Sequence, residues 1–159
     1  MATSQKILEL ENALSVINEW KEAGLKVVFT NGCFDILHLG HLDYLEKSRE
    51  SGDKLIVGLN TDRSVRQLKG PDRPINNEHA RARMLAALAF VDVVIAFDEE
   101  TPLKLIKSVK PDILIKGNDY SIENIVGSDF VLGIGGEVKT INLLEGYSTT
   151  GLIEKIKKY

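Results

Sequence analysis

The sequence predicts an α/β fold in which helices cover both faces of a five-stranded parallel sheet. Short aliphatic runs alternate with longer amphipathic stretches, and the runs are apolar at successive positions, as in strands that are buried on both faces. Strands that alternate with helices join through right-handed crossovers, so we expect a doubly wound sheet. The five expected strands are residues 27–30, 55–60, 91–97, 113–116 and 138–143.

Helical periodicity fills the stretches between these runs. We expect helices over 40–51, closed by Gly52, and over 78–90. Thr101 and Pro102 have the pattern of an N-cap followed by a first helical residue, and residues 148–150 can cap a last helix over 149–158. With the first strand near the centre, the expected strand order is 3-2-1-4-5, a Rossmann-like arrangement.

A further helix is expected before the first strand. Apolar residues recur at helical spacing between 5 and 23, and Gly24 follows them. We therefore predict a helical extension over 1–24 and a domain over 25–159 that contains the sheet. The extension is expected to dock on that domain or on a second subunit.

Composition narrows the range of functions. The 159 residues suffice for one buried core, and the formal net charge of −3 gives no general attraction to nucleic acid or to an anionic membrane. Cys33 is the only cysteine, so no internal disulfide can form and a reducing compartment is expected. The N-terminus lacks the basic region of a signal peptide, and no apolar run has the length of a membrane span. These features predict a cytoplasmic protein.

Two polar stretches follow strands or their extensions and are expected to be mobile loops. Residues 67–77 are rich in Pro, Gly and Asn, and residues 116–129 are rich in turn formers. Both lie at the carboxyl edge of the expected sheet, where open α/β folds bind ligands.

The stretch 31–41 has the strongest chemical signal. Asn31 and Gly32 end the first strand, and His38 and His41 flank Gly40 at an expected helix start near 37 or 38. Histidines three apart on a helix share a face, and free amides at a helix N-terminus attract anions. Glycines allow close approach to the backbone. This pattern favours a polyphosphate site. A transition-metal site that includes Cys33 or Asp35 is the alternative, and histidines that only bond their neighbours are another.

A second anion-binding element is expected at the last helix. Gly146 permits a sharp turn, and Ser148 and Thr149, with the adjacent amides, can hold a phosphate oxygen. An ordinary Ser/Thr cap explains these residues equally well.

These motifs together resemble the cytidylyltransferase-like nucleotidyltransferases. The resemblance rests on residues 31–35 (NGCFD), on the HxGH signature of residues 38–41 and on Ser148–Thr150, and it covers the chain from Lys26 onward. Residues 25–159 are thus expected to form a nucleotidyltransferase domain.

Within this family, four stretches resemble the adenylyltransferases that act on D-glycero-β-D-manno-heptose 1-phosphate. They are "FTNGCFDILHLGH", "GLNTDRSVRQLKGPDRPIN", "DILIKGNDY" and "GGEV". Such domains also form the C-terminal half of a bifunctional kinase–adenylyltransferase. No kinase domain is present here, so the resemblance implies the free-standing form. Glycerol-phosphate cytidylyltransferases have an Arg-Thr pair where this chain has Leu143 and Leu144, which favours ATP over CTP.

The resemblance implies that ATP and a sugar 1-phosphate react to give ADP-heptose and pyrophosphate, which would supply lipopolysaccharide core assembly. It also implies Mg²⁺ bound through the ATP phosphates, no metal held by the protein itself, and a homodimer. The implied catalytic residues are His38, His41 and Lys69. The nucleotide would contact Asn31, Gly32, Cys33, Phe34, His38, Gly40, His41, Lys116, Gly117, Asp119, Gly146, Ser148, Thr149 and Thr150, with the adenine near residues 116–120. The substrate-binding residues would be Asp35, Lys69 and Arg81.

Several alternatives stay open at this stage. Asp35 can orient substrate hydroxyls or a Mg²⁺-bound water, or it can be a turn residue that makes a local hydrogen bond. Lys69 can also be a solvated loop residue. The acceptor could be glycerol phosphate, or flavin mononucleotide as in FAD synthetases, and the chain could be a nucleotide-binding module without turnover.

Overall fold

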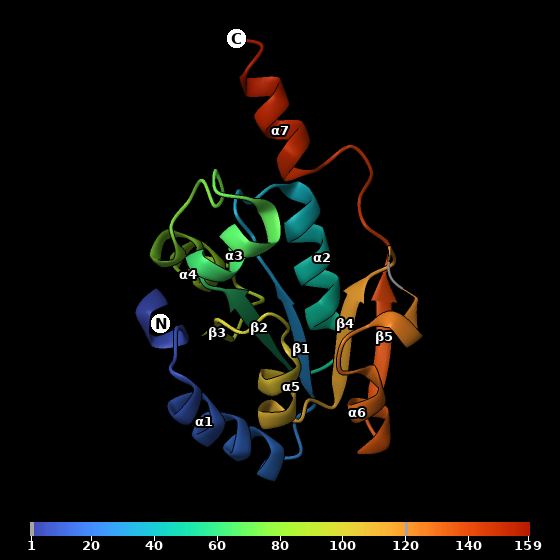
Figure 1. The fold of residues 1–159 in the computed structure, drawn as a ribbon. Coiled ribbons are helices and arrows are strands. Elements are labelled where there is room, and N and C mark those ends of the chain that lie inside the picture. The colour runs from blue at the N-terminus through green and yellow to red at the C-terminus, as the bar shows by residue number, and fades with distance from the viewer. Residues whose placement is uncertain (1, 120) are drawn as a thin grey trace.

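A computed structural model describes residues 2–119 and 121–159. Five parallel strands form one sheet in the order β3-β2-β1-β4-β5, with helices on both faces (Figure 1). The predicted fold class and strand order are therefore confirmed. The strands are β1 (Val27–Gly32), β2 (Lys54–Asn60), β3 (Val93–Phe97), β4 (Ile113–Gly117) and β5 (Glu137–Ile141).

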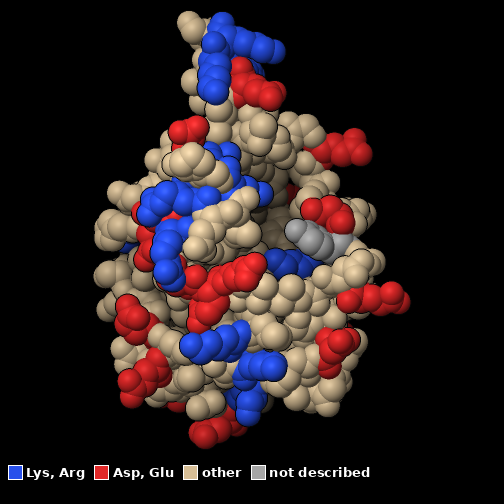
Figure 2. Space-filling model, viewed as in Figure 1, with Lys and Arg blue, Asp and Glu red and all other residues tan. Residues whose placement is uncertain are grey.

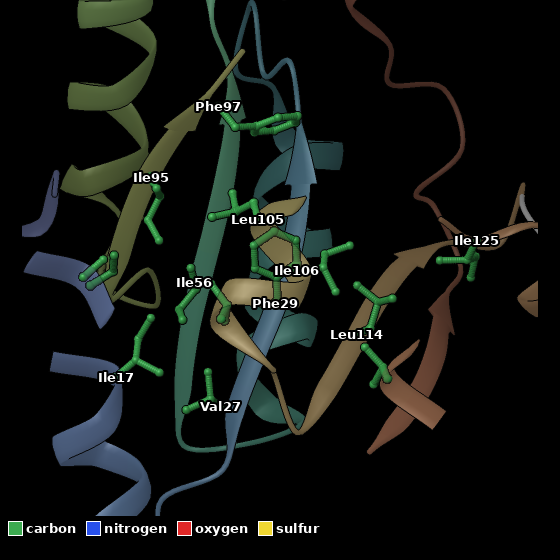
Figure 3. Close-up of a cluster of buried hydrophobic side chains, with 14 residues drawn as sticks. Ile17, Val27, Phe29, Ile56, Ile95, Phe97, Leu105, Ile106, Leu114 and Ile125 are labelled. Carbon is green, nitrogen blue, oxygen red and sulfur yellow. The ribbon is translucent and has the colours of Figure 1, made fainter. Parts of the chain in front are cut away.

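Alternate residues of the central strands belong to two separate hydrophobic cores. On one face, Val27 and Phe29 of β1 pack with α1 (Leu10–Glu22), α5 (Leu103–Val109) and α6 (Ser128–Gly133), as Figure 3 shows for the strand residues and α5. On the other face, Val28 packs with α2 (Leu39–Glu50) and α4 (Glu78–Ala87). Successive side chains of a strand point to opposite faces, so a run that is apolar at every position fits this double coverage.

The start of the chain differs from the prediction. A 3₁₀ helix, η1 (Thr3–Lys6), comes first, and Ile7 forms a parallel bridge with Val94 of β3 before α1 begins. The expected helix over 5–23 is therefore wrong in its first turn, because Leu8 donates its amide to the Val94 carbonyl at 3.0 Å. Ile17 of α1 is 1% exposed and belongs to the core. The extension thus docks on the domain, one of the two possibilities that the sequence left open.

Three further expectations need correction. Residues 67–69 are the last turn of α3 (Asp62–Lys69), so the expected loop over 67–77 begins only at Gly70. The stretch 116–129 includes the end of β4, a 3₁₀ helix η2 (Ile122–Asn124) and the start of α6, a helix that the sequence did not predict. Pro102 is the N-cap of α5, one residue later than expected.

The last part of the chain stands away from the core. β5 is an edge strand with no fully buried residue, and it ends at Ile141, two residues before the predicted end. The final helix α7 (Thr149–Ile156) also has no buried residue and projects from the top of the domain in Figure 1. No helix in the described part of the chain combines the length and the apolar composition needed to cross a membrane.

Candidate functional site

A pocket opens at the carboxyl ends of β1, β2 and β4. Its volume of about 570 Å³ lies within the range of small-molecule sites, and Figure 2 shows the hollow with Lys and Arg side chains on one flank. The pocket brings together most of the predicted site residues: Asn31, Gly32, Cys33, Phe34, Asp35, His38, Gly40, His41, Lys69, Lys116, Gly117, Asp119, Ser148, Thr149 and Thr150. A second hollow of about 440 Å³, between Arg63 and Glu100, contains none of them.

The two histidines form a stacked pair at the start of α2. His38 is the N-cap, and its Nδ1 accepts a hydrogen bond from the His41 amide at 3.3 Å. The ring centroids are 3.8 Å apart. Because Nδ1 of His38 is an acceptor, a neutral His38 ring has its proton on Nε2, which can then donate to a ligand. The helix start therefore sets the tautomer of this ring.

Burial keeps both rings neutral at pH 7. Desolvation lowers the pKa of His38 and, together with the charge of His38, lowers the pKa of His41 to about 4, although the Ile36 carbonyl acts in the opposite direction. Nδ1 of His41 and Oδ1 of Asn31 are buried and make no hydrogen bond with any described residue. A polyanion bound here would raise both histidine pKa values and favour proton uptake.

The glycines of this turn make room for protein side chains. A Cβ at Gly40 would lie 3.1 Å from the His38 ring and 3.1 Å from the Cβ of Tyr147. A Cβ at Gly32 would lie 3.0 Å from the ring of Phe34, which itself has a φ of 45° and meets His41 edge-on. At Gly40 the protein atoms that approach closely are those of His38 and Tyr147, and the close approach of a ligand there stays a prediction.

Asp35 holds the segment that follows α3. Its side chain is 1% exposed and accepts hydrogen bonds from the amides of Ile75, at 2.8 Å, and Asn76, at 2.9 Å, and from Nε of Arg73 at 2.6 Å. Burial raises the pKa of this carboxyl, but the two amides and Arg73 outweigh burial and the net shift is downward. Of the alternatives, this geometry favours a structural role over a group that orients substrate hydroxyls or water, but the hydrogen bonds are not local as expected, since the partners lie 38 to 41 residues away along the chain.

Arg81 does not reach the pocket. Its side chain is fully buried, and it donates to the carbonyls of Cys33, Asn60 and Asn76 and to the Asp62 carboxylate. It thereby ties the ends of β1 and β2 to α3 and to the loop after it. Its predicted contact with substrate stays a prediction.

Two lysines lie on opposite sides of the pocket. Lys69, the last residue of α3, is exposed and makes no ion pair with a described residue. Lys116 at the end of β4 donates to the Asn31 carbonyl at 3.3 Å, and burial lowers its pKa to about 8, which Asp119 partly opposes. The adenine site expected over 116–120 includes Tyr120, which lies outside the described residues.

The start of α7 closes one side of the pocket. Ser148 is the N-cap and its Oγ accepts from the Gly151 amide at 3.0 Å, as the sequence predicted. Gly146 has a φ of 83° in the turn before it, which suits glycine, but this residue does not line the pocket.

Sequence reasoning missed seven lining residues. They are Tyr44, Asn60, Leu68, Arg73, Leu143, Leu144 and Tyr147. Asn60 ends β2 as Asn31 and Gly32 end β1, so the rule that points to carboxyl ends of strands could have found it. Arg73 lies within the turn-forming stretch 67–77, and a cation between two prolines is the signal that could have found it.

The fold and the pocket together define the class of protein to which the chain belongs. A doubly wound sheet with its pocket at the switch point between β1 and β4, and with two helix N-termini on the pocket wall, is the architecture of a nucleotide-binding α/β domain. A family model described as Cytidylyltransferase-like matches residues 29–155. The chain belongs to this family, and the prediction of a nucleotidyltransferase is confirmed at that level.

Two curated relatives within this family have sequences similar to that of the chain. The chain is 54% identical over 151 residues to the bifunctional protein HldE of Caulobacter vibrioides, covering 95% of this chain and 31% of that protein. It is 55% identical over 153 residues to the bifunctional protein HldE of Campylobacter fetus subsp. fetus, covering 96% and 32%. The chain thus spans about a third of the length of these relatives.

Solved structures agree on the fold. The lipopolysaccharide core biosynthesis protein from Thermoplasma volcanium GSS1 is 33% identical, with a TM-score of 0.62, over 79% of this chain and 100% of that one. The pantoate-beta-alanine ligase from Francisella tularensis is 17% identical, with a TM-score of 0.65, over 96% of this chain and 78% of that one. The second likeness shows the fold alone.

Proposed function

We propose that this chain is an adenylyltransferase that converts ATP and D-glycero-β-D-manno-heptose 1-phosphate to ADP-heptose and pyrophosphate. The observation that carries the proposal is the stacked His38–His41 pair at the N-terminus of α2, in one pocket with Ser148–Thr150 at the N-terminus of α7. The identity to the HldE relatives supports the choice of substrates.

The reaction needs positioning and charge neutralisation more than it needs a base. A phosphate oxygen of the acceptor attacks the α-phosphorus of ATP in line, one P–O bond forms, and the bond to pyrophosphate breaks. A phosphate monoester is already anionic at neutral pH, so the attacking oxygen needs no strong base. Groups that donate to the phosphoryl oxygens and to the leaving pyrophosphate lower the barrier.

The position of each residue in the pocket indicates which part of ATP it contacts. His38 donates from Nε2 and His41 lies directly beside it, so the pair contacts the α- and β-phosphates. The amides and hydroxyls at the start of α7 take a further phosphate oxygen. Lys69 adds a mobile positive charge from the end of α3, and Lys116 with Gly117 and Asp119 borders the base.

Mg²⁺ would arrive with ATP. The described residues contain no group of three or more His, Cys, Asp or Glu side chains that could hold a metal ion, and the carboxylate of Asp35 is already engaged by Arg73 and two amides. Mg²⁺ usually binds through substrate phosphates with few protein ligands, and there it would neutralise charge on the triphosphate. The donor set of this pocket fits that arrangement.

One enzyme assay separates the candidate functions. Release of pyrophosphate is measured with ATP or CTP against a panel that contains heptose 1-phosphate, other sugar 1-phosphates, glycerol phosphate and flavin mononucleotide. We expect turnover with ATP and heptose 1-phosphate. Turnover only with CTP and glycerol phosphate would contradict the proposal, and nucleotide binding without turnover on any acceptor would indicate a binding module.

His41→Ala tests the proposed donor. If His41 acts mainly in the transition state, kcat should fall by about 10²-fold or more while the affinity for ATP changes little. Equal losses in kcat and affinity would instead indicate a clamp on bound ATP.

We also propose that the enzyme works in the cytoplasm and that it forms a homodimer. Sedimentation of the purified chain tests the homodimer.

A further inference from the structure

The β2 side of the pocket contains Arg73, a cation to which the proposed nucleotide contacts assign no role. In the proposed reaction the base borders the end of β4, and the phosphates lie at the starts of α2 and α7. Lys69 and Arg73 line the same pocket from the other direction, after β2. Both lie close to the end of β1, since each charge acts to lower the pKa of Cys33 although burial dominates and raises it. This side is therefore available to the second substrate.

Arg73 has the geometry of an anion-binding residue. Its Nε is fixed on Asp35 at 2.6 Å and its side chain is 18% exposed to solvent. The two terminal amino groups make no hydrogen bond with any described residue. A guanidinium that is anchored through Nε presents these two groups as a fork that matches two oxygens of one phosphate.

The anchor of Arg73 is itself fixed from behind. Asp35 is held by the amides of Ile75 and Asn76, and the Asn76 side chain donates to the Asp35 carbonyl at 2.7 Å. Arg81 in turn donates to the Asn76 carbonyl at 3.0 Å. A chain of part-buried hydrogen bonds therefore runs from the fully buried Arg81 to the partly exposed Arg73, and it fixes the plane of the guanidinium.

We propose that Arg73 binds the phosphate of the acceptor substrate and that Asp35 is the positioning residue that orients its guanidinium. The ligand is a phosphate monoester dianion, whose phosphate is held between Arg73 and Lys69 while one oxygen faces the α-phosphorus of ATP. The assignment rests on the proposed function for the identity of the acceptor, but not for the presence of an anion site.

The test uses inorganic phosphate as the probe. The protein is first saturated with α,β-methylene ATP, and phosphate binding is then measured by calorimetry. Arg73→Gln should weaken phosphate binding by at least about 10-fold, close to 1.4 kcal/mol, while the affinity for the ATP analogue stays within about twofold. Arg66→Gln is the matched control: this arginine is exposed on α3 outside the pocket, and its loss should change neither affinity.

Two further variants separate charge from orientation. Arg73→Lys keeps the charge without the fork, so it should bind phosphate more tightly than Arg73→Gln and less tightly than the wild type. Asp35→Asn keeps an acceptor for the two amides but loses the ion pair, and it should weaken phosphate binding less than Arg73→Gln. In the double variant Asp35→Asn/Arg73→Gln, phosphate binding should be no weaker than in Arg73→Gln alone.

Each opposite result overturns part of the assignment. Unchanged phosphate affinity in Arg73→Gln, or equal losses for phosphate and analogue, removes Arg73 from the acceptor site. Additive losses in the double variant remove the positioning role of Asp35. With heptose 1-phosphate as substrate, KM should rise in Arg73→Gln more than kcat falls. A wild-type protein that binds phosphate on Arg73 but turns over no sugar 1-phosphate would overturn the proposed function and leave this site standing.

Discussion

The two walls of the pocket are built in different ways. The β2-side wall, formed by Asp35, Asn60 and Arg73 with Arg81 behind them, is joined by ion pairs and by hydrogen bonds to buried and part-buried backbone groups. The α7-side wall, residues 143–150, is exposed almost throughout, and the helix after it has no buried residue.

This difference follows from the positions of the strands. β1 and β2 are inside the sheet and are covered on both faces, so the loops after them can be held by buried contacts. β5 is at the edge, and the chain after it is held mainly by local caps. The geometry of the β2-side wall therefore depends on the folded core. The α7-side wall can contribute contacts to a ligand while having little effect on global stability.

Removal of Arg81 should have the largest effect on stability. Arg81→Met leaves the buried carbonyl of Asn60, the part-buried carbonyls of Cys33 and Asn76 and the Asp62 carboxylate without this donor, so the free energy of unfolding should fall by about 3–5 kcal/mol. Denaturation in urea measures this change.

The matched control is Arg63→Met. Arg63 pairs with Asp98 on the surface and its side chain is 67% exposed, so its loss should lower the free energy of unfolding far less than the loss of Arg81 does. Equal losses for the two variants would show that the β2-side wall is no better anchored than the surface.

The second prediction concerns pH and His41, which lies between the two walls. The pKa of His41 is lowered from 6.5 to about 4 by burial and by the charge of His38. The unfolded chain therefore binds more protons than the folded one between these values, so stability should fall as the pH is lowered through this window and be fully present above it. At about 1.4 kcal/mol per pKa unit, the loss is up to about 3 kcal/mol.

The measurement compares the wild type with His41→Gln by urea denaturation from pH 7 to pH 4. The carboxylates that titrate in this range are common to both proteins, so the difference isolates the imidazole. A stability difference that does not vary with pH would show that the folded protein binds the proton as readily as the unfolded chain does.

The difference between the two walls also explains which features could be predicted from the sequence. The strands and their order follow from aliphatic runs that alternate with helices, and the His38–His41 pair and Ser148 follow from local spacing. These features need only short-range information, and the structure places them as expected.

The β2-side wall could not be predicted in this way. Asp35 and Arg81 were expected to bind substrate because of their charge, and Arg73 was not predicted. The Asp35–Arg73 ion pair joins residues that are 38 positions apart, and the Arg81–Cys33 hydrogen bond joins residues that are 48 positions apart. Ile7 is a similar case: its periodicity suits a helix, and only the neighbouring edge of β3 makes it a bridge. Pairing over such distances depends on the packed fold.

Gly40→Ala tests the point at which the α7-side wall touches α2. The new Cβ would lie 3.1 Å from the His38 ring and from the Cβ of Tyr147, which is 46% exposed and can move. Helix propensity favours alanine by about 0.5–1 kcal/mol, so stability should change little while KM for ATP rises by about 3–10-fold. Gly133→Ala, with no atom within 4 Å of its Cβ, is the control that should leave KM unchanged. A large loss of stability in Gly40→Ala would mean that Tyr147 is rigidly held.

The smallest effect on stability is expected for Ser148→Ala, which compares directly with Asn77→Ala. Each side chain is an N-cap that accepts one hydrogen bond from a backbone amide. Ser148 accepts it from Gly151 in α7, and Asn77 accepts it from Ala80 in α4. Loss of such a cap usually costs about 1 kcal/mol, and Asn77→Ala should show that cost in global unfolding because α4 is part of the core. In Ser148→Ala the global value should change by less than about 0.5 kcal/mol, because α7 makes no buried contact and can open locally. Amide hydrogen exchange should then become faster in α7 alone, and KM for ATP should rise several-fold. If Ser148→Ala instead costs as much global stability as Asn77→Ala, α7 unfolds together with the core, and the two walls are equally anchored.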